Sequence, residues 1–167
     1  MAYPPVIPPN NRTDATDMVT VHASDHNALA TALANMPWGV VAAPVVLSGA
    51  QQTIPASAIT DITGATITWT RRADRRYIAR YSIQVQQASS AAVFNVYIKD
   101  AAGNNITFRG WTGTAGQYLG LVDFIDVSGA AGAATVKLAA NTPSGSLIIA
   151  NSTSPGILTV EDVGPKP

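Results

Sequence analysis

The sequence predicts an all-β protein: an antiparallel jelly-roll sandwich of about eight to ten strands, preceded by an extended proline-rich arm and one short α-helix. Three observations favour this fold. Turn-forming residues recur about every ten residues from Gly49 onwards. Between these turns, apolar and polar residues alternate with a period of two, as they do along a strand with one buried face. Before them, residues 1–13 contain two Pro-Pro pairs, which suit neither a helix nor a central strand.

The clearest alternation lies in residues 76–100, which read as two long strands joined by a short polar loop. The residues expected on the shared apolar face are Tyr77, Ala79, Tyr81, Ile83 and Val85, followed by Ala92, Phe94, Val96 and Ile98. Two antiparallel strands with one apolar face need a second sheet to cover that face. The sequence therefore predicts a two-layer sandwich built around this hairpin.

The composition is poor in charge. Only 12% of residues are charged while 47% are apolar, and the 10 basic residues balance the 10 acidic ones. Interface cores are depleted in charge, so this composition favours an oligomer. The alternative is a monomer whose surface is rich in Ser, Thr, Asn and Gln. The balanced charge argues against a nucleic-acid partner.

The first residues, 1–37, are predicted to form an attachment arm and helix, and residues 38–167 the jelly-roll domain. Tyr3, Val6 and Ile7 give the arm apolar side chains with which to dock on a neighbouring protein, although a disordered tail is an equal alternative. The arm lacks the pattern of a signal peptide, and no apolar run is long enough to span a membrane. We therefore expect a protein made in the cytoplasm and not inserted in a membrane.

A helix is expected after Ser24 or Asp25, since either side chain can cap free helix N–H groups, and Pro37 ends it. Leu29, Leu33 and Met36 lie on one stripe at helical spacing. A helix of about three turns is unstable alone, so this stripe is expected to pack on something. We assign the three residues to attachment, together with the arm.

Residues 118–127 are apolar on both faces of the predicted strand. Leu119, Leu121, Ile125 and Val127 share one face, and Tyr118, Val122 and Phe124 share the other. A strand that is apolar on both faces is buried on both sides, which in a small antiparallel protein indicates a subunit interface. Asp123 and Asp126 interrupt the strand and need partners.

Two parts of the chain resemble known families. Val19-Thr-Val-His-Ala-Ser-Asp-His-Asn-Ala-Leu-Ala-Thr-Ala-Leu resembles the N-terminal segment of virion proteins of tailed bacteriophages, where a short helix precedes a fibre, tail or decoration module. Residues 38–167 resemble trimeric TNF/C1q-like jelly rolls through residues 77–99, 118–127, 132–138 and 158–165. The resemblance implies a homotrimer, with Tyr118, Val122 and Phe124 at its interface and the helix near the attachment end.

The sequence offers little for catalysis, and no cofactor is expected. It has no cysteine, and no serine-hydrolase, zinc-protease or phosphate-loop motif is present. His22 and His26, with Asp25 between them, have the spacing of a metal pair, but polar residues around a helix cap are the preferred interpretation. Five of the seven arginines lie in residues 71–80; this cluster either meets an anionic partner or, as we favour, is a solvated turn with Asp74 as counter-ion.

The predicted function is therefore a non-enzymatic structural component of a phage virion, of the minor tail or fibre type, which contacts other virion proteins. Contact with a glycan of the host surface is a further option for such a module. One alternative is a capsid decoration protein that stabilises the head. An alternative of another class is a soluble carbohydrate-binding module. In that case Trp111, expected in a glycine-bearing loop at residues 110–116, would contact a glycan, whereas Trp69 is expected in the core or an interface.

Overall fold

The computed structural model describes residues 27–33, 35–37, 39–88, 92–149 and 155–166. The chain divides into two units, Met1–Met36 and Pro37–Pro167, which are described separately. In the first unit residues 27–33 are helical, so the predicted short helix is present, and Leu29 and Leu33 are exposed on it. The arm residues Tyr3, Val6 and Ile7, the cap positions and both histidines lie outside the described residues.

The second unit is all-β, which confirms the predicted fold class. Its strands are β1 Gly39–Val40, β2 Val45–Leu47, β3 Gln52–Pro55, β4 Thr60–Arg71, β5 Arg75–Gln87, β6 Ala92–Lys99, β7 Asn105–Gly113, β8 Tyr118–Asp126, β9 Gly132–Asn141, β10 Ser146–Ile149 and β11 Gly156–Pro165. Every pairing between these strands is antiparallel.

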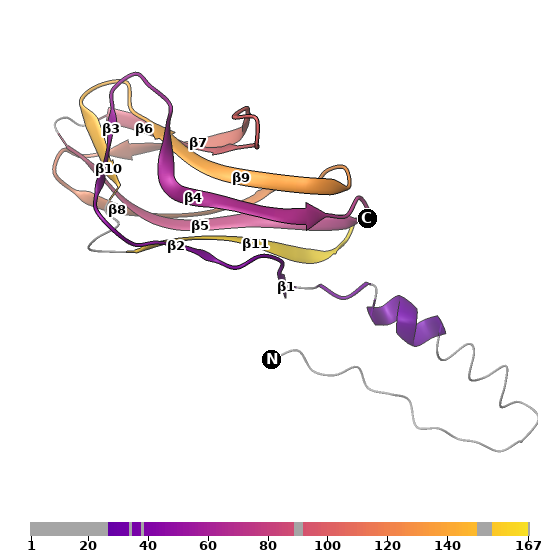
Figure 1. The fold of residues 1–167 in the computed structure, drawn as a ribbon. Coiled ribbons are helices and arrows are strands. Elements are labelled where there is room, and N and C mark those ends of the chain that lie inside the picture. The colour runs from indigo at the N-terminus through magenta and orange to yellow at the C-terminus, as the bar shows by residue number, and fades with distance from the viewer. Residues whose placement is uncertain (1–26, 34, 38, 89–91, 150–154, 167) are drawn as a thin grey trace, which may run out of the picture. The chain divides into compact units, whose positions relative to one another are not determined.

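The strands form two facing sheets (Figure 1). The larger sheet has seven strands and is centred on β5, which pairs with β8 on one side and with β11 and β10 on the other. The smaller sheet has the order β4-β9-β6-β7. The hairpin expected from the sequence is therefore divided, with β5 in one sheet and β6 in the other. Its two apolar faces meet each other across the core.

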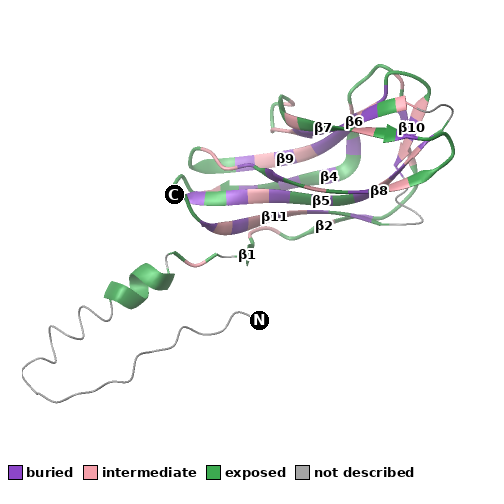
Figure 2. Cartoon of the chain, turned by 180° about the vertical axis from the view of Figure 1, so that it is seen from behind, coloured by how far each residue is buried: buried purple, intermediate pink, exposed green. Residues whose placement is uncertain are grey.

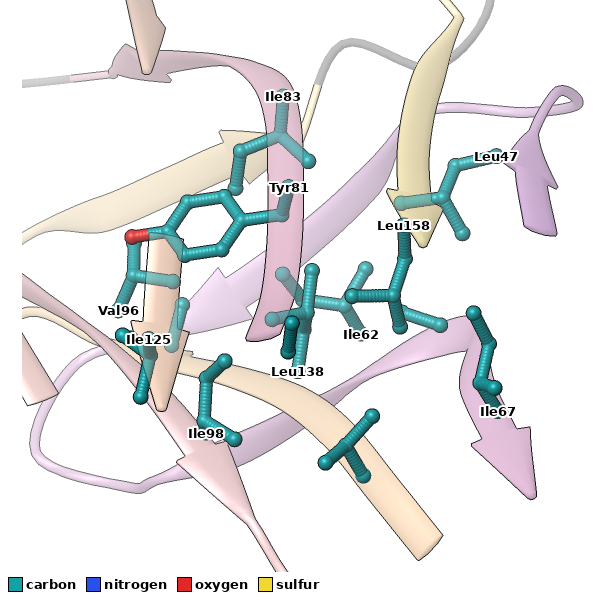
Figure 3. Close-up of a cluster of buried hydrophobic side chains, with 14 of the residues drawn as sticks. Leu47, Ile62, Ile67, Tyr81, Ile83, Val96, Ile98, Ile125, Leu138 and Leu158 are labelled. Carbon is teal, nitrogen blue, oxygen red and sulfur yellow. The ribbon is translucent and has the colours of Figure 1, made fainter. Parts of the chain in front are cut away.

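The core is filled by the inward side chains of both sheets. Along β5, every second residue from Tyr77 to Val85 is buried, as the alternation predicts. Phe94, Val96 and Ile98 of β6 are likewise buried. Figure 3 shows Tyr81 and Val96, from opposite sheets, pointing into the same cluster. Trp69 is also buried there, as predicted.

Strand β4 is longer than the sequence suggests. Residues 53–60 and 64–70 read as separate strands, but Thr60–Arg71 is continuous. Its pairing with β9 shifts register between Asp61 and Thr66, and Gly64 within the shift has a φ of 79°. Glycine adopts this positive φ without strain and so allows a β-bulge, at which the strand bends without ending.

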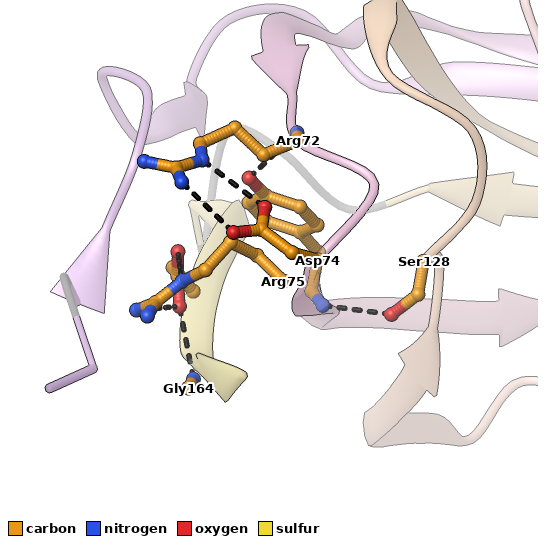
Figure 4. A network of polar contacts seen from close by, with 7 residues as sticks. Arg72, Asp74, Arg75, Ser128 and Gly164 are labelled. Atoms are coloured by element: carbon orange, nitrogen blue, oxygen red, sulfur yellow. Dashed lines mark hydrogen bonds and ion pairs between the residues drawn. The ribbon is translucent and has the colours of Figure 1, made fainter. Parts of the chain in front are cut away.

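A buried ion pair closes one end of the larger sheet. Arg75, the first residue of β5, donates to Asp162 of β11 through Nη2 at 2.7 Å and Nε at 2.8 Å. Asp162 also accepts a hydrogen bond from the backbone N–H of Gly164, across the point where the strand pairing shifts (Figure 4). The hydrogen bonds to Asp162 raise the pKa of Arg75, so the guanidinium of this buried ion pair stays positively charged.

Candidate functional site

The outward side of β8 is the most exposed apolar surface on a single strand among the described residues. Val122 is 70% exposed and Phe124 62%, and Tyr118 lies on the same face. The alternate residues Leu121 and Ile125 point into the core and are buried. β8 is therefore apolar on both faces, as predicted, and one of those faces is uncovered in the single chain. Its burial by another subunit remains a prediction.

Further exposed apolar side chains lie on the other side of β5, whose outward residue between them is Ser82. Val122 lies directly opposite Ser82 of β5, which lies opposite Ile157 of β11, which in turn lies opposite Val46 of β2. Side chains opposite each other in register point to the same face. Ile157 and Val46 are both exposed, and Figure 2 shows the mixture of exposed and buried residues along these strands.

We call this surface the outer apolar face. Its residues are Val46, Tyr118, Val122, Phe124 and Ile157. It lies on the outside of the seven-stranded sheet and spans strands that are far apart in the sequence. Single exposed apolar residues need no explanation, but several of them gathered on one face of a sheet indicate a binding surface.

The charged groups beside the outer apolar face are paired. Arg80 donates to Glu161 at 2.9 Å, and its guanidinium lies 5.8 Å from the centre of the Phe124 ring. Arg76 donates to Asp126, also at 2.9 Å. Partial burial acts to raise the pKa of Asp126, but hydrogen bonds from Ser128 and Arg76 outweigh it and hold the pKa below its ordinary value. The face therefore carries little unbalanced charge.

The other arginines of the cluster are also bonded within the chain, but Arg75 is buried with Asp162, so the cluster is not a solvated turn throughout. Arg71 donates to the backbone carbonyls of Val127 and Ala130 at 2.9 and 2.8 Å. Arg72 pairs with Asp74 at 2.8 Å, and this hydrogen bond lowers the pKa of Asp74. Asp74 is thus the counter-ion expected from the sequence.

An ion pair between the two sheets closes the side of the sandwich between β7 and β8. Arg109 of β7 donates to Asp123 of β8 at 3.1 Å. Asp123 lies opposite Tyr81 in register, and the Tyr81 hydroxyl is buried without a hydrogen bond of good geometry. Burial, together with the charge of Asp123, raises the pKa of Tyr81 above its ordinary value, while the nearby indole of Trp111 partly offsets this.

Trp111 lies in strand β7, so the prediction that it lies in a glycine-bearing loop was wrong. It is part of β7, opposite Phe94, and its ring packs partly buried against the core. The ring nitrogen is buried. A glycan contact through Trp111 stays a prediction, but little of the side chain is presented for stacking.

The exposed aromatic residue of β7 is instead Phe108, which the sequence analysis missed. Its side chain is 55% exposed on the outside of the four-stranded sheet. It lies opposite Tyr97 with ring centres 5.5 Å apart, and Tyr97 is nearly buried. Residues 106–109 are predicted as a strand, but the alternation of Ile106 and Phe108 with Thr107 and Arg109 places the apolar pair on the core side, so it does not predict the exposure of Phe108.

The described residues give no direct sign of a metal or a membrane span. No group of three or more potential metal-ligating side chains comes together in that part of the chain. Within the same residues, no helix has the length and apolar character needed to cross a bilayer.

Comparison with known proteins leaves the family open. No protein-family model matches this chain, and no curated protein matches it. The likeness to tailed-phage and TNF/C1q-like proteins therefore remains a resemblance.

Similar solved structures include virion proteins and carbohydrate-binding modules. A structure of infectious bursal disease virus is 9% identical over 75% of this chain and 42% of that chain, with a TM-score of 0.40. The enzymatically active domain of tailspike protein 4 of bacteriophage CBA120 is 13% identical over 74% of this chain and 19% of that one, with a TM-score of 0.29. A family 35 carbohydrate binding module from an environmental isolate is 20% identical over 80% of this chain and 95% of that chain, with a TM-score of 0.34.

This chain spans less than half of the two viral chains. All three TM-scores are below 0.5.

Proposed function

We propose that this chain is a non-enzymatic structural component of a phage virion, whose sandwich domain associates with identical copies through the outer apolar face. The observation that carries the proposal is the exposure of Val122 and Phe124 on the central part of β8, on the same face of the sheet as the exposed Ile157. Burying such side chains stabilises association by about 1.5–3 kcal/mol each before the costs of association.

The polar groups around this face suit an interface. Arg80 and Arg76 are already paired with Glu161 and Asp126, so a partner surface need not supply countercharges. An interface with an apolar core and a rim of satisfied polar groups is typical of stable protein–protein contacts. We infer that the assembly is a homotrimer, in keeping with the resemblance to TNF/C1q-like jelly rolls.

The first 37 residues are proposed to attach the trimer to other virion proteins. Leu29 and Leu33 are exposed on the helix of the first unit, where a partner protein can cover them. A short helix with an uncovered apolar stripe gains most of its stability from such packing. In this arrangement the sandwich projects as a minor tail or fibre-type module. The alternative within the same class is a capsid decoration protein, with the arm holding neighbouring capsid subunits.

The virion assignment is tested by cosedimentation. Phage particles are assembled in cells that produce the full-length chain, and the chain is then followed in the particle and soluble fractions. The wild-type chain is expected in the particle fraction, and Leu29→Asp with Leu33→Asp is expected to reduce that fraction at least tenfold. Lys137→Asp, on the sandwich, is the charge-matched control and is expected to stay with the particles. Recovery of the wild-type chain only in the soluble fraction would overturn the virion assignment.

Imaging the labelled chain on particles distinguishes its two proposed positions. Label at the tail tip or fibres supports the tail module. Label spread over the head, together with particles that lose DNA at a lower temperature when the chain is missing, supports the decoration alternative.

A further inference from the structure

Strand β9 has a free edge over half its length. On one side β9 pairs with β4 from Gly132 to Lys137 and, beyond the register shift, again at Ala139 and Ala140. On the other side it pairs with β6 from Lys137 to Asn141, because β6 ends at Lys99. Residues 132–136 therefore have no strand partner on the β6 side among the described residues, and Figure 1 shows β9 continuing beyond β6.

A cavity of about 230 Å³ is lined by residues of this free edge. Ala134 and Val136 of β9 line it together with Trp69 of the neighbouring β4. Ala102, in the turn after β6, and Val127, just after β8, are also part of its wall. The cavity thus lies where a continuation of β6 would have covered the core, and its wall combines these apolar side chains with Arg71, Asp100 and Thr135.

The free edge lacks the features that protect most strand edges. Natural edge strands are usually blunted by lysine, proline or bulges, which prevent pairing with another chain. Residues 132–136 read Gly-Ala-Ala-Thr-Val, and the first charged residue of β9 is Lys137. By contrast, the edge strand β8 carries Asp123 and Asp126. The edge at 132–136 is therefore open to another extended chain.

The chemistry of the site favours a neutral peptide. A strand edge presents alternating N–H and C=O groups, which another extended backbone satisfies. The charged groups at the cavity are already bonded: Arg71 to two backbone carbonyls, and Asp100 to Asn104 at 2.8 and 3.0 Å. The cavity is smaller than the roughly 300–1,000 Å³ of sites for drug-sized ligands, but it has room for an apolar side chain.

From this geometry we infer that residues 132–136 bind an uncharged, extended peptide segment of a partner protein, which adds a strand beside β9 and places one apolar side chain in the cavity. The strand hydrogen bonds supply affinity and the cavity selects the side chain. The site lies in the four-stranded sheet, so it is separate from the outer apolar face. It can be tested, and can fail, independently of the self-association proposed above.

The test uses full-length protein and a fluorescein-labelled, blocked pentapeptide, acetyl-Thr-Val-Thr-Val-Thr-amide, with binding followed by fluorescence polarisation. Saturable binding below about 1 mM is expected, and Ala102→Trp, which fills the cavity, is expected to weaken it at least tenfold. Ala115→Trp places the same side chain at an exposed turn away from the cavity and is expected to bind like the wild type. A peptide methylated on its backbone nitrogens is expected not to bind.

Amide hydrogen exchange locates the bound peptide. Binding is expected to slow exchange within residues 132–136. The inference is overturned if the pentapeptide shows no saturable binding, if Ala102→Trp binds as well as the wild type, or if the protected amides lie elsewhere. Loss of self-association in Ala102→Trp, without peptide, would assign the edge to a second copy of the chain and would equally overturn it.

Discussion

Arg75 and Asp162 form a doubly hydrogen-bonded ion pair inside the protein, with side chains 1% and 0% exposed. The pair joins the first residue of β5 to the far end of β11. Breaking such a pair leaves an uncompensated buried charge. Asp162→Asn is therefore expected to lower the free energy of unfolding by about 3–5 kcal/mol, measured by urea denaturation. Asp74→Asn, which removes an exposed partner of Arg72, is expected to leave it nearly unchanged; equal effects would contradict this account.

The buried hydroxyl of Tyr81 predicts a loss of stability in alkali. Its pKa is raised in the folded protein, so the unfolded chain releases this proton at a lower pH than the folded chain does. The stability contributed by the protonated Tyr81 is complete below about pH 10, the ordinary tyrosine pKa, and is lost as the pH rises further towards the folded pKa.

Tyr81→Phe is expected to reduce this alkaline loss, measured as the free energy of unfolding from pH 8 to 11. Near pH 7 its effect is expected to be small, because the hydroxyl makes no hydrogen bond of good geometry. A Tyr81→Phe profile that coincides with the wild type would refute the assignment.

Gly129 leaves space for the guanidinium of Arg71. A Cβ atom at position 129 would lie 2.6 Å from Cζ and Nη1 of that side chain. Gly129→Ala should therefore displace the flexible end of Arg71 from the carbonyls of Val127 and Ala130, which water can reach in part, at a cost of about 0.5–1.5 kcal/mol in unfolding free energy. Because both changes remove the same hydrogen bonds, Arg71→Ala and Gly129→Ala are expected to be strongly non-additive. Additive effects would show that Gly129 acts in another way.

Phe124 and Phe108 provide a matched pair for testing the outer apolar face. Both rings are more than half exposed, but Phe124 is on the seven-stranded sheet and Phe108 on the four-stranded sheet. Phe124→Asp is expected to shift the full-length protein towards monomer, with at least a tenfold increase in the dissociation constant, measured by size exclusion with light scattering. Phe108→Asp is expected to leave the assembly intact. The reverse pattern would contradict this prediction and would indicate that the interface is on the four-stranded sheet.

Local patterns were sufficient for much of the fold. The alternation from Tyr77 to Val85 predicted which side of β5 is buried, and residues 118–127 predicted both faces of β8. These features depend on the strand period alone. The clamp between Arg75 and Asp162 was not predictable, because its partners are 87 residues apart and only the strand pairing brings them together.

Trp111 was misplaced for a physical reason. Gly110 and Gly113 suggested a loop, yet both lie in β7. A Cβ at Gly113 would approach Gln87 and Phe94 to 3.2 Å, and one at Gly110 would approach Asn95 to 3.1 Å. The glycines permit close packing here and do not form a turn. The free edge of β9 could not be predicted from the sequence either, because it depends on where β6 ends beside β9 in the folded sheet.

Sedimentation equilibrium of the full-length wild-type protein tests the central claim most directly. The account predicts a mass three times the 17.3 kDa of one chain, maintained at micromolar concentration. A mass of 17.3 kDa throughout the same concentration range would contradict it, because the outer apolar face would then remain uncovered in solution.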